Sequence, residues 1–125
     1  MILVGQTRSR INTPENCIDL TKQTSLLQLI WLIRVARFVV SVESGPMHIA
    51  AAVTGNLLSI PTWSDPYRIG PHNPDAWVWK HGQLFCVGEL ENARIRKHGR
   101  RFRRKDVTSM VALIRPRVPI DPMVA

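Results

Sequence analysis

Apolar residues in this chain gather in short runs that alternate with polar, proline-containing segments. Short continuous apolar runs bounded by turn residues are typical of buried strands. They predict strands at 1–5, 17–20, 38–42 and 56–61, with two further short strands at 76–80 and 83–87 around Gly82. The run FVVSV at 38–42 is apolar almost throughout, which is typical of a parallel strand buried on both faces.

Helical patterns lie between these runs. Ser25 and Gln28 have the spacing of a capping box. The segment after them is so apolar that it predicts a helix at 25–37 covered on more than one side. Asp106 is placed to cap a last amphipathic helix at 107–114. The alternation of strands and helices predicts an α/β fold, a Rossmann-like parallel sheet with flanking helices.

The segment between the strand at 38–42 and a helix at 46–54 is the most informative part of the chain. Pro46 is preorganised for the first helical position, and Gly55 stands where a C-cap glycine belongs. The turn at 43–45 therefore lies at the carboxyl end of a strand and at the amino end of a helix. Free backbone N–H groups and the helix dipole favour an anion there. The residues alone predict a phosphate-binding strand–turn–helix.

Length and charge add further limits. The 125 residues suit one domain, at 1–115, with a tail at 116–125. No apolar run approaches the roughly 18 residues of a membrane span, and no export signal is evident, so a cytoplasmic location is expected. Cys17 and Cys86 have no partners at metal-ligand spacing. We expect two reduced structural thiols and no metal.

The formal net charge of +8 arises in one segment, 94–105, because the other Lys and Arg residues balance the nine Asp and Glu. Its basic residues are Arg94, Arg96, Lys97, Arg100, Arg101, Arg103, Arg104 and Lys105. The segment is either a solvated loop or a surface for polyanions, with acidic glycolipid or anionic membrane lipid ahead of nucleic acid. Phe102 is the only Phe, Tyr or Trp among these charges, so bases would have no platform on which to stack and nucleic acid is disfavoured as the partner.

At residues 17–74 the chain resembles the carboxyl-terminal domain of family 9 glycosyltransferases, the ADP-heptose:lipopolysaccharide heptosyltransferases and their relatives. Typical family patterns are "DL-x-G-x-TSL", "VVSNDSG-x-MH-x-AAA" and "G-x-TDP…GP". They correspond here to Asp19-Leu20 with Thr24-Ser25-Leu26, to 39–52, and to Trp63-Ser64-Asp65-Pro66 with Gly70-Pro71. The resemblance implies one part of a two-domain GT-B fold.

The resemblance also implies donor binding, in lipopolysaccharide or related glycan synthesis. The donor would be a nucleotide-diphosphate sugar, ADP-linked in such enzymes, and no cofactor is expected. Carried over by position, the diphosphate cradle consists of Ser44, Gly45, Pro46, Met47 and His48. Further donor contacts would come from Glu43, Thr24, Trp63 and Asp65.

Several positions depart from the family patterns. Glu43 replaces a usual Asp, Lys22 a usual Gly, Val42 a usual Asn, and Trp63 a small residue. The chain is also shorter than a complete enzyme, whose acceptor-activating Asp belongs to an amino-terminal domain. Transfer needs an acceptor held in line and a base beside it, so the chain by itself is expected to be inactive.

Other functions stay open on the sequence alone. One is a non-catalytic polyanion-binding module that uses segment 94–105. Another is a hydrolase with Ser44, His72 and Asp65 as a triad, although Val42 and Pro46 stand where a nucleophile elbow has glycines. The apolar helix at 25–37 also predicts an exposed hydrophobic surface, through which the chain would form a homo-oligomer.

Overall fold

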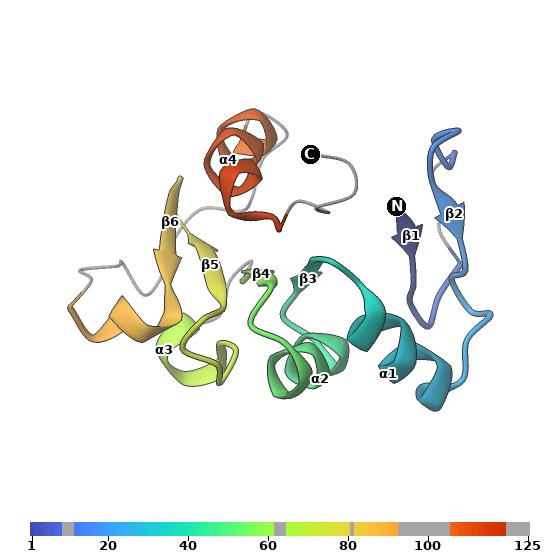
Figure 1. The fold of residues 1–125 in the computed structure, drawn as a ribbon, viewed down its shortest axis with the longest axis horizontal. Helices are drawn as coiled ribbons and strands as arrows, with labels where there is room; N and C mark the ends of the chain where they lie inside the picture. Colours follow the sequence, from blue (N-terminus) through green and yellow to red (C-terminus); the bar gives the residue numbers. More distant parts are fainter. Residues whose placement is uncertain (9–11, 62–64, 81, 93–105, 120–125) are drawn as a thin grey trace. The chain divides into compact units, whose positions relative to one another are not determined.

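A computed structural model describes residues 1–8, 12–61, 65–80, 82–92 and 106–119 (Figure 1). The chain divides into two compact units, Met1–Leu32 and Ile33–Ala125. Segment 94–105 and Trp63 lie outside the described residues. Within the described part, no helix is both long enough and apolar enough to cross a bilayer.

The first unit contains two short parallel strands, β1 (Ile2–Leu3) and β2 (Ile18–Asp19), as the apolar runs predict. A turn follows β2. The Asp19 carboxylate organises this turn, because it accepts hydrogen bonds from the Thr21 N–H at 2.9 Å and the Thr21 hydroxyl at 2.6 Å. The Lys22 N–H then donates to the Gly5 carbonyl at 2.7 Å.

The predicted capping box is confirmed at the start of helix α1 (Leu26–Val35). The Ser25 N–H donates to Gln28 Oε1 at 2.8 Å, and the Gln28 N–H donates to Ser25 Oγ at 3.2 Å. Helix α1 runs across the boundary of the two units and ends two residues before Arg37. Leu27 and Trp31 are exposed, so the expectation that this helix is covered on more than one side is wrong for the described residues.

The second unit is built on a four-stranded sheet in the order β3-β4-β5-β6. Its strands are β3 (Val39–Val42), β4 (Leu57–Ile60), β5 (Trp77–Lys80) and β6 (Gln83–Cys86). The first three are parallel, which confirms the α/β, Rossmann-like prediction. The sheet as a whole is mixed, because β5 and β6 pair as an antiparallel hairpin. Their connection is too short for a parallel crossover, and its Gly82 has φ 77°.

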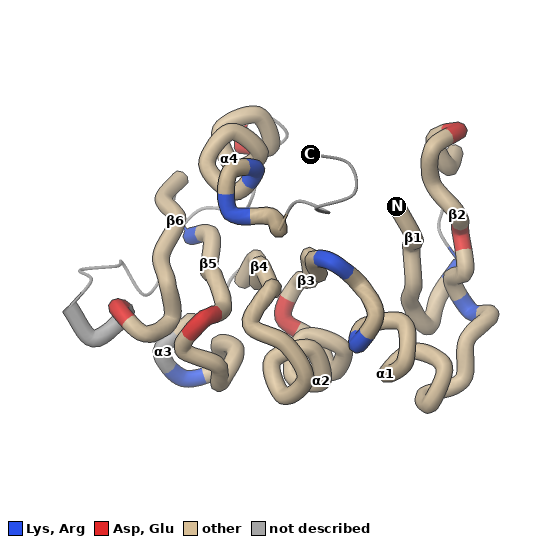
Figure 2. The backbone as a smooth tube through the Cα atoms, viewed as in Figure 1, with Lys and Arg blue, Asp and Glu red and all other residues tan. Residues whose placement is uncertain are grey.

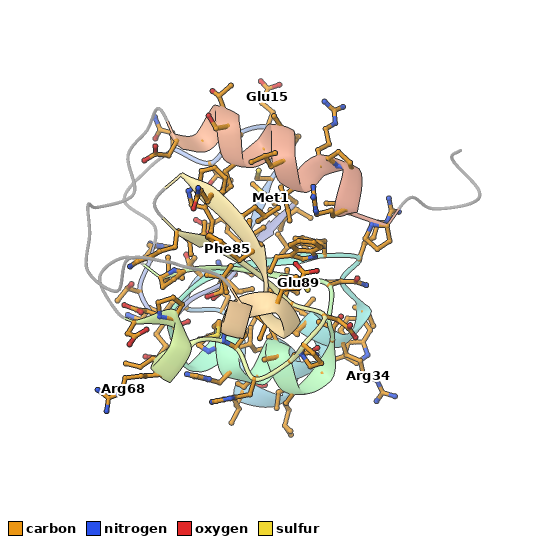
Figure 3. All side chains as sticks on the ribbon, turned by 90° about the vertical axis from the view of Figure 1, so that its left-hand side faces the viewer. Met1, Glu15, Arg34, Arg68, Phe85 and Glu89 are labelled. Atoms are coloured by element: carbon orange, nitrogen blue, oxygen red, sulfur yellow. The ribbon has the colours of Figure 1, made fainter. Side chains whose placement is uncertain are left out.

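Helices cover both faces of this sheet (Figures 1 and 3). Helix α2 (Gly45–Val53) packs on β3 and β4 from one face, where the short helix α3 (Pro66–Ile69) also lies. Helix α4 (Asp106–Ile114) has Asp106, the predicted cap, as its first residue, and it packs on the opposite face. Short 3-10 turns follow β6 (Val87–Asn92) and α4 (Arg115–Arg117).

The core under α4 contains side chains from three elements. Leu58, Ile60, Trp79, Met110 and Ile114 pack together there. The cluster stops at the edge strand β3, whose Val40 and Val42 are 57% and 53% exposed. The prediction that this strand is buried on both faces is therefore wrong. Edge position explains the difference, because α4 lies over β4 to β6.

The carboxyl end of α2 is held by a side chain and by close packing. Asn73 Nδ2 donates to the carbonyls of Ala51 and Thr54, each at 3.0 Å. Gly55 is not a left-handed C-cap as predicted, because the extended residue Thr54 ends the helix. Glycine is needed at position 55 for space, since an added Cβ would lie 2.6 Å from Asp75 Cβ.

Candidate functional site

The turn between β3 and α2 lies where the sequence predicts it, at the carboxyl edge of the parallel strands. Glu43 and Ser44 follow β3, and α2 begins at Gly45 with a proline in its first turn. Figure 2 shows an acidic position on the tube between β3 and α2, and a basic position where β5 ends. This edge is where ligands collect in open α/β sheets.

Ser44 has an extended backbone, with φ −166° and ψ 173°, and its side chain does not cap the helix. Its hydroxyl instead donates to the Val42 carbonyl at 3.3 Å and lies 3.4 Å from Ser41 Oγ. The Ser44 carbonyl accepts the N–H groups of Met47 at 3.1 Å and His48 at 3.3 Å. The first turn of α2 is therefore closed by main-chain hydrogen bonds, and a side-chain oxygen does not block its end.

Gly45 opens this turn to solvent. It is the first residue of α2, so its N–H has no carbonyl four residues back within the helix to which it could donate. A Cβ added at Gly45 would meet none of the described atoms within 4 Å. An anion can therefore approach the main chain here without displacing a side chain.

The remaining residues of the predicted cradle differ in how far their side chains are exposed to solvent. The His48 side chain is exposed in the first turn of α2, where it can donate to an anion. The Met47 side chain is fully buried in the core, so Met47 contributes its main chain to the turn. Pro46 has no N–H and is half-buried.

The motifs of the sequence do not mark Lys80, which lies at the same edge of the sheet. It ends β5 and is 2% exposed, and its Nζ donates to the Pro61 carbonyl at 3.2 Å. Burial lowers the pKa of the Lys80 ammonium, and the negative charges of Glu43 and Asp65 oppose that shift. The sequence signal was a lysine that ends the otherwise apolar run WVWK.

Two predicted site residues from different loops thus act on the same ammonium. Glu43 comes directly after β3, and Asp65 precedes α3, in which the N–H groups of Arg68 and Ile69 donate to the Asp65 carbonyl. Thr24 lies in the first unit, directly before the Ser25 cap, so its proposed donor contact stays a prediction. Trp63 and the basic segment fall outside the described residues.

Comparison with protein families decides the relationship. The sequence model of glycosyltransferase family 9 (heptosyltransferase) matches residues 5–98, well over half of the chain. The chain belongs to glycosyltransferase family 9. No match was found among curated proteins or among solved structures.

The structure explains two motif positions of this family 9 chain. An added Cβ at Gly70 would lie 2.2 Å from the Pro66 carbonyl oxygen, which also accepts the Gly70 N–H at 3.1 Å. The glycine of the "DP…GP" pattern therefore closes α3. Lys22, where the resemblance expects glycine, has φ 62°. That left-handed backbone is one that glycine adopts without strain.

The geometry does not fit a hydrolase. A nucleophile elbow holds its serine on a strained turn and beside a histidine. Ser44 is extended and donates to the Val42 carbonyl, while His72 is exposed. Among the described residues, no three His, Cys, Asp or Glu side chains gather as a metal site.

Proposed function

We propose that this family 9 chain is the donor-binding portion of a glycosyltransferase, and that its β3–α2 turn holds the diphosphate of a nucleotide-activated sugar. The observation that carries the proposal is the open amino end of α2 at Gly45, at the carboxyl edge of the parallel strands β3 and β4. A diphosphate suits this position, because backbone N–H groups and the helix dipole both favour negative charge.

Each residue of the turn has a specific role in this proposal. The Gly45 N–H donates to a phosphate oxygen, and the absence of a side chain allows the close approach. The exposed His48 imidazole adds a second donor, whose contribution grows when the ring is protonated. Ser44 shapes the turn through its hydrogen bond to Val42.

The proposal assigns donor binding to this chain and leaves catalysis to another part of the enzyme. Group transfer needs a general base near an acceptor that is held in line. The two carboxylates at this edge of the sheet, Glu43 and Asp65, act on the Lys80 ammonium. We propose an ADP-linked sugar as the first donor to test, with glycan synthesis on a lipopolysaccharide-like acceptor as its use.

Isothermal titration of the chain with ADP-, UDP- and GDP-sugars tests the proposal. The Gly45→Trp variant fills the open space at the turn, and Thr108→Trp places the same side chain at an exposed position of α4. We expect saturable binding, tightest for the ADP-sugar, that Gly45→Trp abolishes and Thr108→Trp retains. Binding that survives in Gly45→Trp and weakens steeply with salt would contradict the proposal and assign the interaction to segment 94–105.

A further inference from the structure

Lys80 is an unusual residue for a protein interior. Lysine is almost never fully buried unless it is paired, yet Lys80 is 2% exposed. It lies on the same face of the sheet as Ser59, since Val78 is the register partner of Ser59 and side chains alternate along β5. This is the face opposite the Leu58, Ile60 and Trp79 cluster.

Lys80 interacts with two loops of the site, through one hydrogen bond and through charge. Its Nζ donates to the carbonyl of Pro61, the residue directly after β4. The charge of Glu43 acts on it from the loop after β3, and that of Asp65 acts from the loop after β4. Both carboxylates therefore stabilise the cation that burial alone would disfavour.

We propose that Lys80 is a positioning residue of the donor site, whose buried ammonium holds the loops after β3 and β4 in the arrangement that receives the diphosphate. This inference rests on the proposed function. Glu43 is the residue before Ser44, so an ammonium that holds the Glu43 carboxylate in place also holds the backbone that leads into the open turn at Gly45. Without the ammonium, Glu43 and Asp65 would be like charges at one edge of the sheet, and their repulsion would open the two loops.

Lys80 acts through its neighbours and does not contact the donor. Its side chain is almost inaccessible, and its hydrogen bond goes to a main-chain carbonyl. Its loss should therefore change the geometry of the turn even when no ligand is present. This consequence separates positioning of the site from a general contribution to stability.

The test uses Lys80→Met, Glu43→Gln and the double variant in the full chain. ADP affinity is measured by calorimetry, and the amide resonances of Ser44 and Gly45 are recorded without ligand by ¹H–¹⁵N NMR. We expect Lys80→Met to weaken ADP binding by about tenfold or more, roughly the equivalent of one lost charge-assisted hydrogen bond. We also expect it to shift both amides.

The double variant tests whether Lys80 acts through Glu43. If it does, Glu43→Gln weakens ADP binding in the same direction, and the double variant binds ADP no more weakly than Lys80→Met. If Lys80 and Glu43 act independently, the fold-losses of ADP affinity in the two single variants would instead multiply in the double variant. Ser59→Ala serves as the matched control, because it alters another buried polar residue on the same face and should leave ADP affinity unchanged. If Lys80→Met does not fold, Glu43→Gln and Asp65→Asn provide the same comparison.

The outcomes separate this inference from the proposed function. Wild-type affinity and unshifted Ser44 and Gly45 amides in Lys80→Met would overturn the role of Lys80 and leave donor binding intact. A folded wild-type chain that does not bind ADP would overturn the proposed function. The amide shifts of Lys80→Met alone would then decide whether Lys80 holds the turn in place.

Discussion

Replacement of Gly70 by alanine should destabilise the second unit through one close contact. The new Cβ would lie 2.2 Å from the Pro66 carbonyl oxygen, so the two atoms would have to separate by about 1 Å to reach ordinary contact. The same oxygen accepts the Gly70 N–H at 3.1 Å, and that hydrogen bond closes α3. Separation of the two groups therefore breaks the hydrogen bond and unwinds the short helix that begins after Asp65.

Two contributions give the size of the effect. Overpacking of this kind costs about 1–3 kcal/mol, and the lost hydrogen bond adds about 1 kcal/mol. We expect Gly70→Ala to lower the free energy of unfolding by about 2–4 kcal/mol. Urea denaturation followed by circular dichroism and by tryptophan fluorescence measures this change, since Trp77 and Trp79 lie in the sheet that α3 adjoins.

Gly45→Ala is the matched control, because its added Cβ would enter open space and its backbone is helical. We expect it to change the free energy of unfolding by less than about 1 kcal/mol, as for a helical Gly→Ala exchange. An unfolding curve for Gly70→Ala that coincides with that of Gly45→Ala would refute the steric argument. The glycine of the "DP…GP" pattern would then have no steric explanation.

Three further changes test separate parts of the fold. Ser59→Ala removes a buried hydroxyl that has no hydrogen-bond partner in the described structure. Urea denaturation should therefore show that the free energy of unfolding rises by about 1 kcal/mol. Lys22→Gly removes the strain of a left-handed backbone at φ 62° but makes the unfolded chain more flexible. Thermal unfolding should show that the free energy of unfolding rises by about 0.5 kcal/mol as the net of these two effects. Hydrogen bonds from Thr21 lower the pKa of Asp19, so its contribution to stability is present above about pH 4 and is lost as pH falls through the lowered pKa. NMR titration of the carboxyl carbon should show that the Asp19 pKa returns toward its ordinary value in Thr21→Val; an unchanged value would contradict this assignment.

The elements with local signals were predictable from the sequence. Ser25 and Gln28 form the predicted capping box, and Pro46 lies in the first turn of α2. Gly82 turns the hairpin between β5 and β6. Each of these signals depends on residues only a few positions apart, and hydrogen bonding or backbone geometry within that segment decides the outcome.

The features that the sequence did not predict depend on contacts between segments far apart in the chain. Exposure of Val40 and Val42 follows from the edge position of β3, and the need for Gly55 follows from Asp75, which belongs to another loop. Lys80 is the clearest case, because its hydrogen-bond partner lies 19 residues away. A lysine at the end of a strand gives no sign in the sequence that it will be buried, or that the charges of Glu43 and Asp65 will act on it.

The most direct test of donor binding at the β3–α2 turn is an NMR titration of the ¹⁵N-labelled chain with an ADP-sugar. We expect saturable shifts centred on the amides of Ser44, Gly45 and His48, with the Gly45 amide moving downfield as it donates to phosphate. Shifts confined to segment 94–105, with these three amides unmoved at saturation, would contradict donor binding at the turn.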